Sequence, residues 1–173
     1  MTAPLHGDPG SCSQTGGALR RLASTLEAAT VRAGQAGSHA EESWTGRVAR
    51  DIGKRHRLLL ATAQTTAAQL DRTGMALQAH ATDLAEALHE ARAVEERATV
   101  AGLRVVDGQV RLPWGVSGVA DAASVSVLED QRDVLQAELD RVAVLLARRR
   151  QRLVETLAAA RVELAEQALV LRS

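Results

Sequence analysis

The apolar residues of this chain recur at helical spacing over three long stretches, which two short breaks separate. In the first stretch they alternate three and four residues apart, at Leu19, Leu22, Leu26, Ala29, Ala33, Ala36 and Ala40. This spacing places them on one narrow face of a helix, as in a coiled-coil seam. Ser13 or Thr15 is expected to cap the start of this helix.

A second helix is predicted from about residue 47 to residue 101, because the helical spacing resumes there. Its stripe runs through Val48, Ile52, Arg55, Leu59, Ala63, Ala67, Leu70, Gly74, Leu77, Ala81, Leu84, Leu88 and Ala91. Small side chains in a seam let a neighbouring backbone approach closely, so that dispersion contacts replace bulk. We expect the interaction seam to consist of Leu59, Leu70, Leu77, Leu84 and Leu88.

A connector over residues 102–120 is predicted to contain a small β-hairpin. Apolar residues alternate on both sides of Asp107-Gly108, a dipeptide typical of a two-residue hairpin turn. Trp114 follows, and we expect it to cover one end of the helical rod.

A third helix is predicted over residues 121–173 and is nearly as long as the second. Its apolar face comprises Leu128, Leu135, Leu139, Val142, Leu146, Leu153, Leu157, Ala160, Leu164 and Leu171. Two matched long helices with a short connection pack antiparallel. The predicted fold is therefore all-α, an elongated antiparallel rod of three long helices. Its expected parts are a flexible leader at 1–13, a helical hairpin at 14–101, the connector and the C-terminal helix.

Composition limits what such a rod can bind. Hydrophobic residues make up 46% of the 173 residues but aromatic residues only 1%, so the apolar content is mainly Ala, Leu and Val. These side chains fill a thin seam between helices, and they are too small for a wide core or a large ligand pocket. We therefore expect no small-molecule substrate. The thin two-helix end is expected to bind a second copy or another helical hairpin.

The charges argue against a dedicated nucleic-acid binder, since 21 basic and 21 acidic residues give a net charge of zero. The strongest charge run, Arg148–Arg152, has acidic neighbours and no interleaved aromatic residues for base stacking. We interpret it as a solvated helix face paired with acids of a neighbouring helix. The alternative is a nucleic-acid or anionic-membrane patch. The candidate acidic partners are Asp51, Glu41 and Glu42.

Motifs of catalysis and metal binding are not found in the sequence. It contains no zinc-ligand spacing, no phosphate-binding glycine loop and no nucleophile turn. Glu86 and His89 form a single Glu-X-X-His pair, whereas a di-iron bundle requires two such pairs. Cys12 is the only cysteine, which excludes an internal disulfide. We therefore predict no enzyme activity, no metal site and no cofactor.

Targeting signals are also not seen. The first fifteen residues lack the basic start and apolar run of a signal peptide. No window reaches the roughly 18 consecutive apolar residues of a membrane span. We expect a cytoplasmic protein, and any secretion would follow a route that does not depend on a signal peptide.

The break between the first two helices contains Trp44, Thr45 and Gly46. Gly46 tolerates a positive φ and allows the chain to reverse, while the Trp44 indole either plugs the turn or contacts a partner. A helix, a Trp-X-Gly turn and a returning helix resemble the Trp-X-Gly (WXG) family of helical-hairpin proteins associated with type VII secretion. The stretches at 7–9 and 102–108 are similar to its larger actinobacterial members.

This resemblance covers roughly residues 7–100 and implies a non-catalytic interaction protein, acting as a secretion substrate, partner or chaperone-like component. Secreted members or their partners carry a Tyr-X-X-X-Asp/Glu motif after the second helix, and this chain contains no Tyr. His80 lies where relatives often have an aromatic residue. Export with a partner and retention in the cytosol are both compatible with this pattern. The alternative function is a cytosolic coiled-coil scaffold unrelated to secretion.

Overall fold

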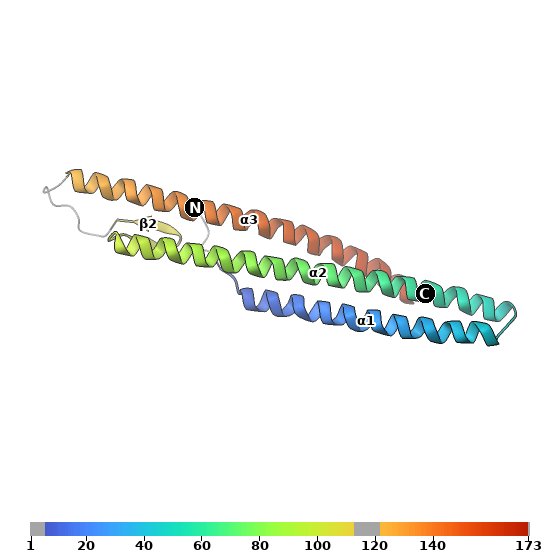
Figure 1. The fold of residues 1–173 in the computed structure, drawn as a ribbon. Helices are drawn as coiled ribbons and strands as arrows, with labels where there is room; N and C mark the ends of the chain where they lie inside the picture. Colours follow the sequence, from blue (N-terminus) through green and yellow to red (C-terminus); the bar gives the residue numbers. More distant parts are fainter. Residues whose placement is uncertain (1–5, 113–121, 173) are drawn as a thin grey trace. The chain divides into compact units, whose positions relative to one another are not determined.

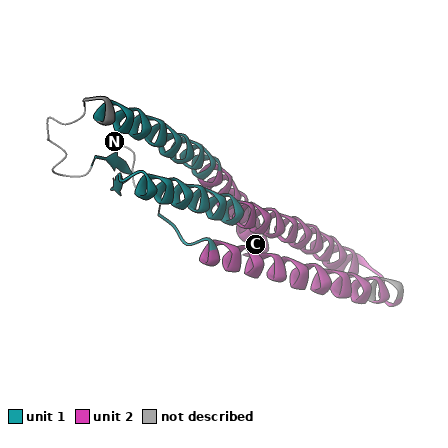
Figure 2. Cartoon of the chain, turned by 60° about the vertical axis from the view of Figure 1, so that its left-hand side comes forward, with its two compact units in different colours: residues 1–9, 80–152 teal, residues 10–79, 153–173 magenta. Residues whose placement is uncertain are grey.

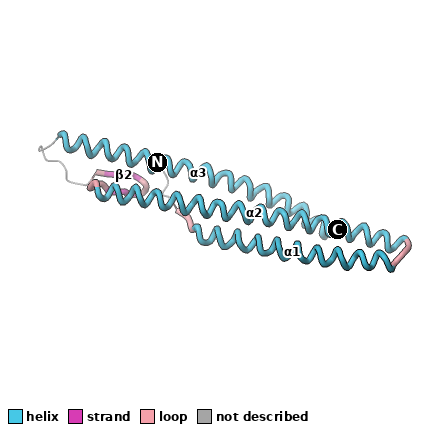
Figure 3. The backbone as a smooth tube through the Cα atoms, viewed as in Figure 1, coloured by secondary structure: helices cyan, strands magenta, loops and turns pink. Residues whose placement is uncertain are grey.

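A computed structural model describes residues 6–112 and 122–172, with the side chains of 40–42 and 122–124 excepted. Its elements are three long helices and a two-stranded antiparallel sheet between the second and third (Figures 1 and 3). They are α1 (Pro9–Ser43), α2 (Arg47–Val100), β1 (Arg104–Val106), β2 (Gln109–Arg111) and α3 (Ala122–Arg172). The predicted all-α fold with a small hairpin is confirmed. Across the described part of the chain, no helix is long and apolar enough to span a membrane.

The chain divides into two compact units (Figure 2). Unit 1 comprises residues 1–9 and 80–152, and unit 2 comprises residues 10–79 and 153–173. Unit 2 therefore combines most of α1 with the first part of α2 and the last part of α3. Unit 1 combines the remaining parts of α2 and α3 with the hairpin. Unit 2 thus contains segments of three long helices, whereas the long helical segments of unit 1 come from α2 and α3 alone. This agrees with the expected two-helix end.

The core of unit 1 is a seam between α2 and α3. Its buried positions on α2 alternate four and three residues apart, at His80, Leu84, Ala87, Ala91, Val94 and Ala98. The buried residues of α3 that complete the seam are Leu135, Leu139, Val142 and Leu146. This alternation is that of a coiled coil, so the two helices pack antiparallel by interdigitating side chains.

A glycine ends α2 and directs the chain into this core. Gly102 has a φ of 78°, and its N–H donates to the Thr99 carbonyl at 3.0 Å. The Leu103 N–H donates to the Ala98 carbonyl at 2.8 Å, which completes a Schellman motif. The side chains of Leu103 and Ala98 are both buried in the same core cluster. The carbonyls at the helix end are therefore satisfied while the chain reverses.

The hairpin has the turn that its sequence predicts. Asp107 and Gly108 have positive φ values of 53° and 75°, as a two-residue primed turn requires. Gln136 of α3 holds the hairpin by its side-chain amide. Its Oε1 accepts from the Val110 N–H at 2.8 Å, and its Nε2 donates to the Gly108 carbonyl at 3.2 Å. Trp114, expected to cover an end of the rod, lies outside the described residues.

Helix α1 begins earlier than predicted. Its first residue is Pro9, not a residue next to Ser13 or Thr15, so the part of the predicted leader from residue 9 onward is helical. Proline suits the first helical position, because its φ is preset and its missing N–H has no intrahelical partner there. The sequence interpretation gave Pro9 and Gly10 the role of loop residues.

The face that α1 buries in unit 2 also differs from the predicted one. Gly16, Ala23 and Thr30 are buried, whereas Leu22 is 54% exposed. The reason is a close backbone approach, since a Cβ on Gly16 would lie 2.6 Å from the carbonyl oxygen of Gly74 in α2. Only glycine permits this distance, so small residues of α1 lie closest to α2, while Leu19 and Leu26 of the predicted face are half-buried.

Candidate functional site

The Trp-X-Gly turn connects α1 to α2 in unit 2. Gly46 has a φ of 117°, as expected, and its carbonyl accepts the Arg50 N–H at 3.2 Å to begin α2. A Cβ at this position would meet no atom within 4 Å. Glycine is therefore required here by backbone conformation, not by lack of space.

Trp44 is 49% exposed. It borders an open hollow of about 340 Å³, whose other lining residues are Thr45, Gly46, Ala49, Arg50, Gly53 and Arg57. An indole that served only as a plug would be buried against the helices. The observed exposure leaves a large part of the ring available to another molecule.

The predicted apolar stripe of α2 stays exposed next to this turn. Val48 is 62% exposed, Ile52 50% and Leu59 38%. At 3.6 residues per turn these three positions lie within about 40° of one another around the helix. They form an open apolar strip at the start of α2, on a different face from the residues that line the hollow beside Trp44. Leu59, expected in the seam, is therefore only partly covered by the chain.

The other predicted seam residues lie farther along α2 and are less exposed. Leu84 is buried, at 2% exposure, while Leu70, Leu77 and Leu88 are half-buried. Leu88 packs against the cluster that contains Leu84. Leu84 is thus the predicted seam residue that the chain buries, and the interaction seam as a whole stays a prediction.

The register of α3 in unit 2 explains why the start of α2 is more exposed than its later part. The Thr66 hydroxyl lies 2.8 Å from the side-chain amide of Gln167, within hydrogen-bond distance, which aligns α3 antiparallel to α2 at this level. The last described residue of α3, Arg172, then lies beside α2 at about Ala61. The strip of α2 that contains Val48 and Ile52 precedes this level, so no described part of α3 covers it.

A polar stripe of α2 faces inward in unit 2, and the hydrophobic spacing did not reveal it. Its residues are Thr62, Thr66, Gln69 and Thr73. Each threonine hydroxyl donates to the carbonyl four residues earlier, at 2.8 to 2.9 Å. The hydroxyls are satisfied within the helix, so the threonine methyl groups can pack as apolar surface.

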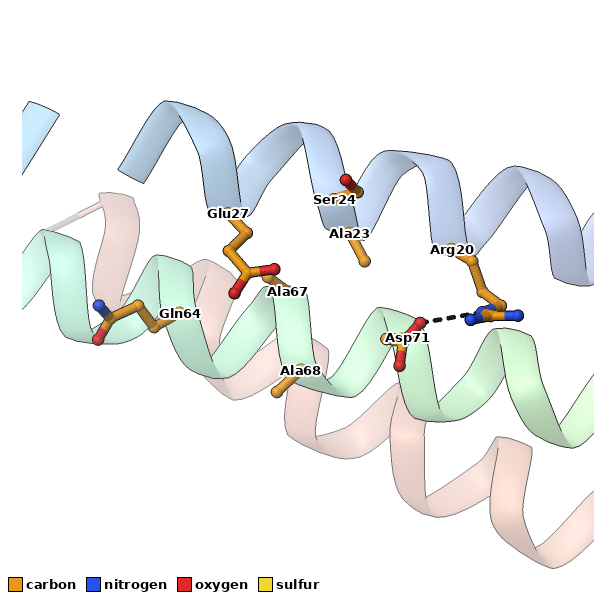
Figure 4. A pocket seen from close by; sticks show the side chains of 8 residues that line it. All are labelled: Arg20, Ala23, Ser24, Glu27, Gln64, Ala67, Ala68 and Asp71. Carbon is orange, nitrogen blue, oxygen red and sulfur yellow. Dashed lines mark hydrogen bonds and ion pairs between the residues drawn. The ribbon is translucent and has the colours of Figure 1, made fainter. Parts of the chain in front are cut away.

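A second hollow, of about 430 Å³, lies between α1 and α2 of unit 2 (Figure 4). Small residues such as Ala23 and Ala67 form part of its lining. Arg20 donates from Nε to Asp71 Oδ1 at 3.1 Å and from Nη1 to Gln78 Oε1 at 3.1 Å. Arg20 is thus held by polar groups of α2, and the hollow lies where the facing side chains of the two helices include alanines.

The arginine run of α3 pairs with acids of α2, as predicted, but with different ones. Arg149 Nη1 lies 2.9 Å from Asp83 Oδ1 and 3.9 Å from Glu86 Oε2. The run therefore contributes to α2–α3 packing in unit 1. The expected partners were Asp51, Glu41 and Glu42, and the antiparallel register instead places Arg149 beside the later half of α2.

An ion pair between Arg97 of α2 and Glu138 of α3 lies on the surface of unit 1. Both guanidinium Nη atoms donate to the carboxylate, one of them to Oε1 at 3.3 Å. This hydrogen bond lowers the pKa of Glu138 and raises the pKa of Arg97. The pair joins α2 and α3 near the hairpin.

Glu138→Gln is expected to weaken the dependence of stability on pH in acid. A carboxyl whose pKa is lower in the folded than in the unfolded state contributes stability above its unfolded value, about 4.3. That contribution is lost as the pH falls through the folded pKa. The difference in thermal midpoint between the wild type and Glu138→Gln should therefore be present at neutral pH and disappear in acid.

The matched control for this measurement is Glu90→Gln. Glu90 is exposed and has no ion-pair partner within residues 6–112 and 122–172. Its replacement is expected to leave the midpoint unchanged at every pH. A Glu138→Gln difference that persisted unchanged into acid would show that the carboxylate charge does not cause it.

The side chains that could bind a metal ion or act in catalysis are dispersed along the described helices. Within the residues that the structure describes, no three His, Cys, Asp or Glu side chains are grouped to hold a metal ion. His80 is buried, and its Nδ1 has no hydrogen-bond partner.

Comparison with known proteins found no matching family model, no matching curated protein and no matching solved structure. The feature that best fits a functional site is therefore the exposed Trp44 turn with its apolar strip.

Proposed function

We propose that this chain is a non-catalytic helical interaction protein of the Trp-X-Gly type, which acts in type VII secretion as a substrate, partner or chaperone-like component. The observation that carries this proposal is the exposure of Trp44 at the α1–α2 turn, together with Val48 and Ile52. Exposed apolar side chains that are continuous along a helix mark sites of protein contact. The positive φ of Gly46 supports the resemblance on which the secretion role rests.

The mechanism of such a protein is the presentation of a shaped surface. Val48 and Ile52 are one helical turn apart, and an apolar strip of this kind packs into a groove of a partner helix pair. Trp44 adds a large, rigid contact at the turn that precedes α2, and Trp is among the residue types that most often dominate interfaces. The partner we propose is a second helical-hairpin protein or another copy of the chain. If export occurs, the Tyr motif would come from a different helical-hairpin protein, because this chain contains no Tyr.

Trp44→Ala is expected to reduce partner recovery at least tenfold, since loss of an interface Trp costs about 2 kcal/mol or more of binding free energy. The same change should lower the free energy of unfolding by only about 1 kcal/mol or less, because the indole is half exposed. The measurement is an affinity pull-down from the native cell, with the partners identified by mass spectrometry. Urea denaturation of the purified variant gives the stability.

The matched control is Leu22→Ala, which removes an apolar side chain of similar exposure, 54%, from another surface of unit 2. It is expected to keep partner recovery at the wild-type level. Capture of a helical-hairpin protein or a secretion ATPase by the wild type alone would support the proposal. Capture of helical proteins unrelated to secretion would favour the cytosolic coiled-coil scaffold. Unchanged recovery by Trp44→Ala would contradict a role for the turn.

A further inference from the structure

The Trp44 turn and the first turns of α2 combine apolar and basic side chains. We call Trp44, Val48 and Ile52, with the cations between residues 47 and 57, the tip. Its cations are Arg47, Arg50, Lys54, Arg55 and Arg57, against the single acid Asp51. Even with the two glutamates that precede the turn, residues 41–57 carry a net charge of +2. In the described part of the chain, the first four of these cations have no ion-pair partner.

A second copy of the tip is an unfavourable partner for this surface. Like charges placed face to face cost several kcal/mol of binding free energy, so a symmetric tip-to-tip contact would oppose itself. The partner that fits is an apolar depression with acidic residues at its edge.

Unit 1 contains such a depression. A groove of about 340 Å³ is lined by Ala101, Val134 and Leu135, with polar edges at Arg97, Asp130 and Gln131. Leu135 is buried, whereas Val134 is 59% exposed at its side. The groove therefore has a closed apolar floor and an accessible apolar wall.

The edge of this groove is acidic. Arg97 is held by Glu138, so its charge is compensated. Residues 129–133 of α3 include three acids and one arginine, and that arginine, Arg132, pairs with Asp133 at 2.8 Å. Glu129 and Asp130 have no ion-pair partner among residues 6–112 and 122–172. Of these two carboxylates Asp130 lines the groove and is thus available there for a basic side chain.

The two units also differ in total charge, which the zero net charge of the chain conceals. Unit 1 has 10 basic and 13 acidic residues, a net charge of −3, and unit 2 has 11 basic and 8 acidic residues, a net charge of +3. Unit 2 of one copy is therefore attracted to unit 1 of another, and each unit repels its own kind.

We propose that the tip of one copy docks into the unit 1 groove of a second copy, with the Trp44 indole against Val134 and Leu135 and the tip cations beside Asp130. This inference rests on the proposed function, in that the chain acts by helix contacts, and it names a second copy as one partner. The contact joins different surfaces of the two copies. It is therefore heterologous and propagates into open chains or rings.

The first test measures the mass of the purified chain by light scattering after gel filtration. At about 50 mM salt the weight-average mass should rise with concentration and exceed twice the monomer mass of 18.3 kDa. At about 500 mM salt it should fall toward that of the monomer, because the charges are screened. A chain that stays monomeric up to about 100 μM would overturn the inference. Binding to a different helical protein would leave the proposed function intact.

The second test uses two variants that each remove one half of the contact. Trp44→Ala removes the tip anchor, and Val134→Arg fills the groove edge with a like charge. Each variant alone should be monomeric, and their equimolar mixture should form a 1:1 dimer, because one intact tip and one intact groove are still present. A mixture that stays monomeric, or a Val134→Arg variant that still associates alone, would contradict a head-to-tail contact.

Two further measurements separate docking from damage to the fold. Val144→Arg changes a side chain of α3 with 47% exposure outside the groove lining and should associate like the wild type.

In a chain carrying Trp114→Phe, Trp44 is the only tryptophan. Its fluorescence should shift to shorter wavelength as the concentration rises, and this shift should be lost when Val134→Arg is added. No shift on association would place Trp44 outside the contact.

Discussion

Leu84→Ala is expected to lower the free energy of unfolding by about 2–4 kcal/mol, as large-to-small changes do in a packed core. Leu84 is 2% exposed and forms a buried cluster with Ala87, Val142 and Leu146 across the α2–α3 seam. The small Ala87 cannot fill the space that a shortened side chain leaves. The seam is thin, so the structure has few other side chains that can move into the cavity.

The matched control is Leu59→Ala, which removes the same atoms from the same predicted stripe. Leu59 is 38% exposed, so its loss should cost less, about 1 kcal/mol. Urea denaturation followed by circular dichroism measures both variants. Equal costs for the two leucines would contradict the packing, because they would place Leu59 in an intrachain seam as well.

Gly74→Ala is expected to destabilise the protein by about 1–3 kcal/mol, even though alanine is the better helix former by about 1 kcal/mol. A Cβ on Gly74 would lie 2.6 Å from the Gly16 carbonyl oxygen and 2.5 Å from Arg20 Cγ. The arginine side chain can move away, but the backbone oxygen moves only with α1. The two helices must therefore separate, and Gly74→Leu should cost more than Gly74→Ala.

Gly34→Ala provides the control with the opposite sign. A Cβ on Gly34 would lie 3.6 Å from Leu60 Cδ1, which is ordinary van der Waals contact. This change should stabilise the protein by about 0.5–1 kcal/mol through helix propensity alone. Thermal and urea denaturation of the two alanine variants distinguish these effects. Stabilisation by both would show that α1 and α2 do not approach closely at Gly74.

Effects on stability can be distinguished from effects on binding, because the residues to be replaced are buried in one case and exposed in the other. Leu84 and Gly74 are buried, and their replacement should act on folding. Trp44 and Val134 are 49% and 59% exposed, and their replacement should act on association while the helices stay intact. A loss of binding in a variant with wild-type stability therefore reports on the surface itself.

The candidate site was only partly predictable from the sequence. Trp44 and Gly46 stand out by residue type alone, because an isolated Trp beside a glycine between two helical stretches indicates a turn. The exposure of Val48 and Ile52 was not predictable. Helical spacing shows that residues share a face, and it does not show whether another helix covers that face.

The sequence by itself determined the features that depend on local conformation. Gly46, Asp107 and Gly108 adopt the positive φ values that their turns require, and the helices begin and end close to these breaks. The buried face of α3 at Leu135 and Leu139 also follows from spacing, since both belong to the apolar face that the sequence predicts for this helix.

Only the tertiary structure decided which of two neighbouring faces α1 buries and where α3 stops covering α2. On α1 the leucine spacing and the glycine spacing define different faces, and the close approach of Gly16 to Gly74 selects the second. On α2 the contact of Thr66 with Gln167 sets the register that leaves Val48 exposed. Both outcomes depend on distances between segments far apart in the chain, and a periodic pattern within one helix carries no information about such distances.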